Sequence, residues 1–232
     1  DVAREAASGL VRHMMEGMNE WQVARLSPVR KESRATRVLA SALSEYGARW
    51  GMRDAFSSPY LRLPDSWDEL ADGLEGKFRR NVRRKVRQAE EETDLTYRFG
   101  GESVRDVDPA FDISKDTWQH EQGTGITSTE TIEHFYRELA SKVSDRGWLR
   151  VAYLLADGEP VSYELALEYD NRHYNLKIGY RQQRRSLSPG RVLKQAVLRR
   201  AISRGLDEYD FLGTAESFKM RWTDRVRPIG TL

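Results

Sequence analysis

The stretch from Tyr180 to Leu193 has the residue types of an anion-binding turn. It lies between a predicted strand and a predicted helix, and its small residues let the backbone approach an anion closely. The free N–H groups of the helix's first turn then point at the anion, and arginines add bidentate donors. The residues concerned are Arg184, Arg185, Ser188, Pro189, Gly190 and Arg191. The pattern indicates a phosphate site, and an ordinary strand-to-helix turn with solvated arginines is the open alternative.

Glu164 is the candidate for acid–base chemistry on the strand next to the one that precedes this turn. It lies between Tyr163 and Leu165 in an apolar run, and a desolvated glutamate has a raised pKa suited to a general base. The open alternative is a solvent-facing residue on a half-exposed sheet.

A predicted helix from about Glu75 to Glu92 carries a dense group of basic residues. Seven of them lie between Lys77 and Arg87, around an apolar stripe that faces a core. The stripe consists of Phe78, Val82, Val86 and Ala89. The basic group is a solvated face, or it recognises an anionic acceptor through Arg79 and Arg83, or it contacts nucleic acid.

The elements that must position these residues form an α/β pattern. Tight turns at Asp157-Gly158 and Asp170-Asn171 connect three predicted strands, over 148–156, 160–169 and 173–181. A helix over 190–204 and a strand over 207–212 follow. Five further helices are predicted, over 1–17, 32–47, 103–120 and 129–145, and one that begins after Ser66. Strands are predicted over 20–26, 51–63 and 94–99, and residues 217–232 are expected to be extended.

The composition fits a globular protein with a real core and excludes several kinds of site. Of 232 residues, 39% are hydrophobic and 32% are charged, and no stretch approaches the roughly 20 apolar residues that cross a bilayer. The lack of cysteine excludes disulfides, thiolate catalysis and cysteine-based zinc sites. The four histidines show no metal-ligand spacing, so we expect no metal. The chain begins at Asp1 without a secretory signal, and we expect a piece of a longer cytoplasmic protein.

The order of elements and several motifs resemble the GNAT acyltransferase superfamily. The run from Arg185 to Gly190 is similar to that family's pyrophosphate loop, with Ser188 in place of the first glycine. Motifs across about residues 57–232 look like the CelD-type acetyltransferases of cellulose and exopolysaccharide gene contexts, which are similar in turn to Fem-type transferases with two tandem GNAT-like halves. The motifs are Ser57–Trp67, Lys77–Lys85, His134–Ala140, Ser188–Gly190, Asp210–Gly213 and Phe218–Trp222.

This resemblance implies a fold and a domain division. The fold is α/β (α+β), a GNAT fold with a mixed, mostly antiparallel central sheet flanked by helices. Residues 1–64 would be part of a first GNAT-like half, 65–93 a helical connector with the basic helix, and 94–232 a complete acyltransferase domain.

The resemblance also implies roles for individual residues. Ile178 and Gly179 would contact the pantetheine arm of acetyl-CoA or another acyl-CoA, and the turn residues given above would hold its pyrophosphate. The usual GNAT glutamate is not evident, which leaves Glu164 as the candidate base. Three further residues have a catalytic and a structural interpretation each. Asp210 is an orienting group, or it caps or pairs with an arginine. Lys219 is a phosphate or carboxylate ligand, or one end of an ion pair. Tyr180 is the acid for the thiolate, or a packing residue. Trp118 would border the acceptor site.

The implied activity is acyl transfer from acyl-CoA to an amine or hydroxyl of a polar acceptor, such as a sugar or nucleotide-sugar. One alternative is Fem-type transfer from aminoacyl-tRNA, the only case in which we expect a nucleic-acid partner. A non-catalytic GNAT-fold binding module is the other alternative, because the consensus glutamate is missing and Ser188 replaces a glycine.

Overall fold

The computed structural model describes residues 1–17, 21–117, 120 and 122–232, and the chain forms two compact units. The first unit comprises Asp1–Pro59, Gly213–Glu216 and Arg225–Leu232. The second comprises Tyr60–Leu212 and Ser217–Asp224, and it contains every described residue that the sequence assigns to the candidate site. The prediction that residues 1–64 belong to a first GNAT-like half stays a prediction.

A mixed sheet forms the centre of the second unit. Its strands are β3 (Leu95–Gly100), β4 (Leu149–Ala156), β5 (Glu159–Tyr169), β6 (Arg172–Tyr180) and β7 (Glu208–Asp210), in the order β7-β6-β5-β4-β3. All neighbours are antiparallel except β6 and β7, which are parallel. The last residues of β2 (Arg53–Arg62) add an antiparallel edge beside β7. The predicted mixed, mostly antiparallel sheet is confirmed.

Local turn chemistry explains why the central strands form where the sequence predicts them. Asp157 and Gly158 have φ values of 54° and 81°, and Asp170 and Asn171 have 52° and 55°. Two successive residues with positive φ make the tight hairpin turns whose twist matches that of the flanking strands. Each of the three predicted strands is therefore found within one residue of its expected start and end.

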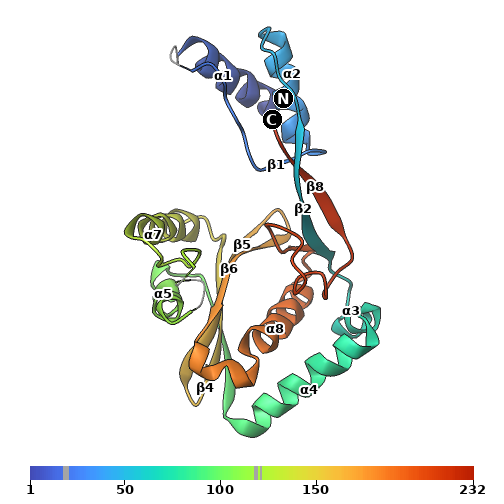
Figure 1. Ribbon diagram of the computed structural model, residues 1–232, viewed down its shortest axis with the longest axis vertical. Helices are drawn as coiled ribbons and strands as arrows, with labels where there is room; N and C mark the ends of the chain where they lie inside the picture. The colour runs from blue at the N-terminus through green and yellow to red at the C-terminus, as the bar shows by residue number, and fades with distance from the viewer. Residues whose placement is uncertain (18–20, 118–119, 121) are drawn as a thin grey trace. The chain divides into compact units, whose positions relative to one another are not determined.

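Helices cover both faces of this sheet (Figure 1). On one face lie η1 (Val104–Val107), α5 (Asp108–Lys115) and α7 (Glu130–Ser144), around buried Phe111 and Tyr153. On the other face lies α8 (Pro189–Ser203), with α4 (Gly76–Glu92) and α3 (Trp67–Gly73) packed against it. The predicted stripe of α4 packs into this second core through Phe78, Val82 and Ala89. Ser66 caps α3 as predicted, since its hydroxyl accepts from the Glu69 N–H at 3.2 Å.

The described residues of the first unit form two helices and three short strand segments. They are α1 (Val2–Glu16), α2 (Arg34–Glu45), β1 (Val29–Arg30), β8 (Val226–Thr231) and the part of β2 that pairs with β8. Val11, Ala42 and Leu43 form its small buried cluster. None of the described helices in either unit is both long and apolar enough to cross a membrane.

Three local predictions differ from the structure. Within the predicted strand over 20–26, the described residues 21–26 form no strand, because only Leu26 exchanges backbone hydrogen bonds, with Leu232. The predicted extended end is strand only from Val226, and residues 217–222 are turns. The loop before α8 contains a 3-10 helix, η2 (Gln182–Leu187), that the sequence pattern does not reveal.

Candidate functional site

Strands β6 and β7 part several residues before the predicted anion-binding turn. Their ladder covers three residue pairs and stops at Tyr174 and Asp210, where β7 ends. β6 continues to Tyr180, and Ile178 and Gly179 lie in this continuing part. A strand that extends past its neighbour can offer backbone groups to an extended ligand. Contact of Ile178 and Gly179 with a pantetheine arm stays a prediction.

The turn itself consists of η2, one left-handed residue and the start of α8. Ser188 has φ 54° and ψ 46°, the region that glycine adopts most readily. The backbone N–H groups of Arg191 and Val192 donate to the Ser188 carbonyl oxygen at 2.9 and 3.2 Å, and no side chain in the described part of the molecule caps α8. A Cβ on Gly190 would have its nearest neighbour in the Tyr180 ring at 3.9 Å, so the first turn of α8 has space beside it.

Arg191 is the arginine of this turn that other side chains hold in place. Its guanidinium donates to Asn81 Oδ1 on α4, and its Cζ lies 5.9 Å from the centroid of the Phe78 ring. Arg184 and Arg185 are exposed on η2. η2 and the first turn of α8 together thus carry one fixed and two solvent-facing guanidinium groups.

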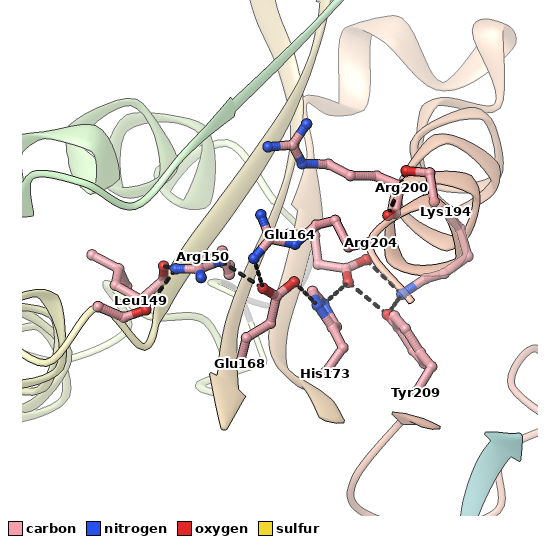
Figure 2. Close-up of polar contacts among 11 residues, drawn as sticks. Leu149, Arg150, Glu164, Glu168, His173, Lys194, Arg200, Arg204 and Tyr209 are labelled. Atoms are coloured by element: carbon pink, nitrogen blue, oxygen red, sulfur yellow. Dashed lines mark hydrogen bonds and ion pairs between the residues drawn. The ribbon is translucent and has the colours of Figure 1, made fainter. Parts of the chain in front are cut away.

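Glu164 lies at the centre of a buried network of charged and polar groups (Figure 2). One carboxylate oxygen lies 3.0 Å from His173 Nε2 and accepts from the Tyr209 hydroxyl at 2.6 Å, and the other accepts from Lys194 Nζ at 2.5 Å. Lys194 also contacts the Tyr209 hydroxyl. The network ties β5, β6, β7 and α8 together one residue before the β6–β7 ladder ends.

A second carboxylate, Glu168, extends the network towards the end of β5. Its Oε1 lies 3.2 Å from His173 Nδ1, and its Oε2 accepts from Arg150 at 2.7 Å and lies 3.0 Å from Arg204. A small pocket opens beside these groups, with Phe99, Arg150 and Arg200 in its wall. The two carboxylates and the imidazole thus form one connected group with the basic side chains of Lys194, Arg150 and Arg204.

The prediction of a raised pKa for Glu164 is wrong. Burial alone would raise it, but the charge of Lys194 and the hydrogen bond to His173 outweigh burial and lower the pKa of Glu164 to about 2. The solvent-facing alternative is wrong as well, because Glu164 is only 2% exposed. A carboxylate this acidic, with both oxygens bonded, is a poor proton acceptor at neutral pH. The geometry fits a positioning role for Glu164.

Asp210 and Lys219 both bind the backbone of Leu212. Asp210 Oδ1 accepts from the Leu212 N–H at 2.9 Å, and Lys219 Nζ donates to the Leu212 carbonyl oxygen at 2.8 Å. Leu212 has φ 51°, a conformation that costs free energy for a residue with a Cβ. The contact of Asp210 fits its structural interpretation as a cap. Lys219 binds a backbone carbonyl oxygen, so its expected ion pair stays a prediction, as does substrate contact by either residue.

Gly179 and Tyr180 have close neighbours that the sequence does not reveal. A Cβ on Gly179 would overlap the ring of Tyr163, which faces it across the β5–β6 ladder. The space that a side chain at position 179 would fill is therefore occupied by the ring of Tyr163 on the neighbouring strand. Tyr180 is half-buried and lies beside Gly190, at the end of β6 nearest the turn.

Polar side chains also gather on the opposite face of β6. Thr127 Oγ1 donates to Ser114 Oγ at 3.1 Å and lies 3.1 Å from His120 Nδ1. Lys177 of β6 donates to the Thr124 carbonyl oxygen at 2.8 Å, and burial lowers its pKa. Trp118, the predicted acceptor-site residue, lies outside the described residues.

The two arginines predicted to bind the acceptor have different surroundings. Arg79 is half-buried and pairs with Asp72 at 2.5 Å, a contact between α4 and α3. Arg83 is exposed on α4. Acceptor binding by either residue stays a prediction. Among the described residues, no group of three or more His, Cys, Asp or Glu could hold a metal ion.

Sequence reasoning missed His173, Lys194 and Tyr209, the partners of Glu164. One signal was present: Lys194 lies three, four and seven residues before Val197, Leu198 and Ala201, on the apolar stripe of its predicted helix. A lysine on such a stripe needs a buried acid, because an unpaired buried charge is very costly. Glu164, in the apolar run of a neighbouring strand, was the acid available.

The sequence matches the family model of the acetyltransferase (GNAT) domain over residues 76–220, and the chain belongs to this family. A search of curated proteins found no match. The matched range begins at α4 and includes the parting strands, the turn and the whole buried network.

Solved structures with a similar fold include FemX, which is 14% identical with a TM-score of 0.61 over 99% of this chain and 77% of its own. L-PGS from Bacillus licheniformis is 11% identical with a TM-score of 0.60 over 96% of this chain and 69% of its own. The C-terminal domain of a putative lysylphosphatidylglycerol synthetase from Agrobacterium fabrum is 12% identical with a TM-score of 0.55 over 83% of this chain; the match spans 64% of that chain, under two thirds. These likenesses confirm the Fem-like GNAT fold, and the CelD-type resemblance stays a prediction.

Proposed function

We propose that this protein transfers an acyl group from acyl-CoA to an amine or hydroxyl of a polar acceptor, such as a sugar or nucleotide-sugar. One observation carries the proposal: β6 extends past the end of β7, and η2 connects it to a helix start that has no side-chain cap and has arginines around it. A ligand with a linear arm and a diphosphate matches both parts, since a strand edge suits the arm and a helix N-terminus suits the diphosphate.

The residues of this chain would bind and orient the donor. The first turn of α8 and Arg191 would hold the diphosphate, and the backbone at Ile178 and Gly179 would align the arm so that the thioester lies near the point where the strands part. When bound, the donor supplies an activated acyl group. The buried Glu164 network would keep β6, β7 and α8 in the spacing that this geometry needs.

Two substitutions of Gly190 test the proposal with one residue. A Cβ at this position meets only ordinary contacts, so Gly190→Ala should keep its affinity for CoA and acetyl-CoA in calorimetric titrations. Gly190→Glu places a carboxylate where the phosphate would bind, while an acid in the first turn of a helix does not disfavour folding. We expect Gly190→Glu to fold and to lose CoA binding. Absence of CoA binding by the unchanged protein at millimolar ligand would overturn the proposal.

Transfer from aminoacyl-tRNA is the second candidate function. The exposed basic residues of α4, among them Arg80, Arg83 and Arg84, favour it, because such a face can neutralise several phosphates. It predicts tRNA binding whose affinity falls steeply as the salt concentration rises. A salt slope near zero would remove this candidate.

A further inference from the structure

Three arginines from separate elements gather at the start of α8. Arg84 comes from α4, Arg191 from the first turn of α8, and Arg221 from the turns over 217–222. The Cζ atoms of Arg191 and Arg221 lie 5.9 and 4.7 Å from the centroid of one ring, that of Phe78. Burial lowers the pKa of Arg191, and the charges of Arg221 and Arg84 lower it further, as expected of like charges held close together.

The aromatic residues beneath Arg191 and Arg221 give these two side chains a fixed base. Phe78 is buried and packs edge-on against Trp222, with ring centroids 4.9 Å apart. Asn81 accepts from the Arg191 guanidinium. Arg84 and Arg221 are exposed and Arg191 is half-buried, so all three can reach a ligand from solvent. An aromatic face stabilises a guanidinium without neutralising it.

None of the three arginines forms an ion pair with a carboxylate in the described part of the chain. Other arginines of α4 do: Arg79 pairs with Asp72, and Arg87 lies 3.7 Å from Glu91. Three like charges without a counter-ion repel one another, and this repulsion is relieved when an anion binds between them. Guanidinium groups are also the side chains best matched to the geometry of a phosphate.

We propose that Arg84, Arg191 and Arg221 bind a phosphate group of the ligand at the turn before α8. The identity of that ligand rests on the proposed function: CoA carries a diphosphate and a separate 3′-phosphate, and either group has the charge and shape that the three arginines require. Arg84 and Arg221 lie outside the strand, turn and helix that form the rest of the donor site.

The experiment measures affinities for CoA, for dephospho-CoA and for inorganic pyrophosphate by calorimetric titration. Arg84→Gln and Arg221→Gln are the test variants, and Arg87→Gln is the matched control, an exposed arginine of α4 that already has a carboxylate. Loss of one charge-assisted contact should weaken CoA binding by about tenfold or more in each test variant. The control should stay within about twofold of the unchanged protein.

Thermal unfolding without ligand separates binding from folding. Removal of one repelling charge should leave the unfolding temperature of both test variants unchanged or slightly raised, whereas a purely structural role would lower it. If only CoA loses affinity in the variants, the arginines hold the 3′-phosphate. If CoA and dephospho-CoA lose affinity equally, they hold the diphosphate.

The outcomes distinguish this site from the proposed function. Tight CoA binding that neither test variant weakens, or an equal loss in Arg87→Gln, overturns the arginine site and leaves the function standing. If CoA does not bind but pyrophosphate binds and both test variants weaken it, the arginine site stands and the function falls. Binding of none of the three probes overturns both.

Discussion

Replacement of Glu164 with glutamine should destabilise the second unit strongly. Glu164 is 2% exposed, and its carboxylate is bonded to His173, Lys194 and Tyr209. Glutamine keeps the size of the side chain but removes its charge, which leaves the ammonium of Lys194 buried without a counter-ion. Breaking a buried ion pair from one side costs about 3–5 kcal/mol, because an uncompensated charge remains.

A double-mutant cycle shows whether this cost comes from the ion pair. Lys194→Met alone should also be destabilising, since it leaves Glu164 buried with a charge that only His173 balances. In the double variant both charges are gone. We expect its loss in free energy of unfolding to be smaller than the sum of the two single losses by about 2 kcal/mol or more.

Urea denaturation followed by tryptophan fluorescence measures these free energies of unfolding, because Trp67 and Trp222 lie in the second unit. Arg87→Gln, an exposed arginine, serves as the control and should change the free energy by less than about 0.5 kcal/mol. Additive single losses, or a cost below about 1 kcal/mol for Glu164→Gln, would refute the reasoning.

The pKa of His173 is raised above 6.5, because its hydrogen bonds to Glu164 and Glu168 outweigh burial. The stability that the protonated imidazole gives to the fold is therefore present below pH 6.5 and is lost as the pH rises through the folded-state pKa. The urea midpoint should fall on the alkaline side in the unchanged protein and fall less in His173→Gln. Burial opposes ionisation of Glu168, but His173 and Arg150 outweigh burial and lower the pKa of Glu168 to about 2. The stability that the Glu168 carboxylate gives to the fold is therefore present above pH 4.5 and is lost on acidification toward pH 2. Glu168→Gln should make stability depend less on pH in this acidic range. Gly179→Ala should cost about 1–3 kcal/mol in urea denaturation, because its Cβ overlaps the Tyr163 ring. Ser188→Val should lower the unfolding temperature, whereas Ser188→Gly should change it little, because φ at this position is 54°.

Much of the sheet could be predicted from sequence because its signals are local. The turns at Asp157-Gly158 and Asp170-Asn171 fix the ends of their strands within a few residues of chain. The apolar stripe through Phe78 and Val82 likewise identifies α4 and its buried face. In contrast, the Leu26–Leu232 bonds join opposite ends of the chain, and the alternation in residues 20–26 carries no information about them.

The electrostatics of the site could not be predicted, because they depend on distant residues. Lys194 and Tyr209 lie 30 and 45 residues after Glu164, and their positions depend on how α8 and β7 pack. The apolar neighbours of Glu164 left its burial and its exposure both open, and the direction of its pKa shift follows from Lys194 and His173. The same holds for Arg84 and Arg221, which approach Arg191 only in the folded chain.

The most direct test of the account is a crystal structure with CoA bound. It should show phosphate density within hydrogen-bonding distance of the backbone at Gly190 and of Arg191, with the arm of the ligand running along β6 past Ile178. Density for CoA at any other place on the second unit, with the first turn of α8 vacant, would contradict the account.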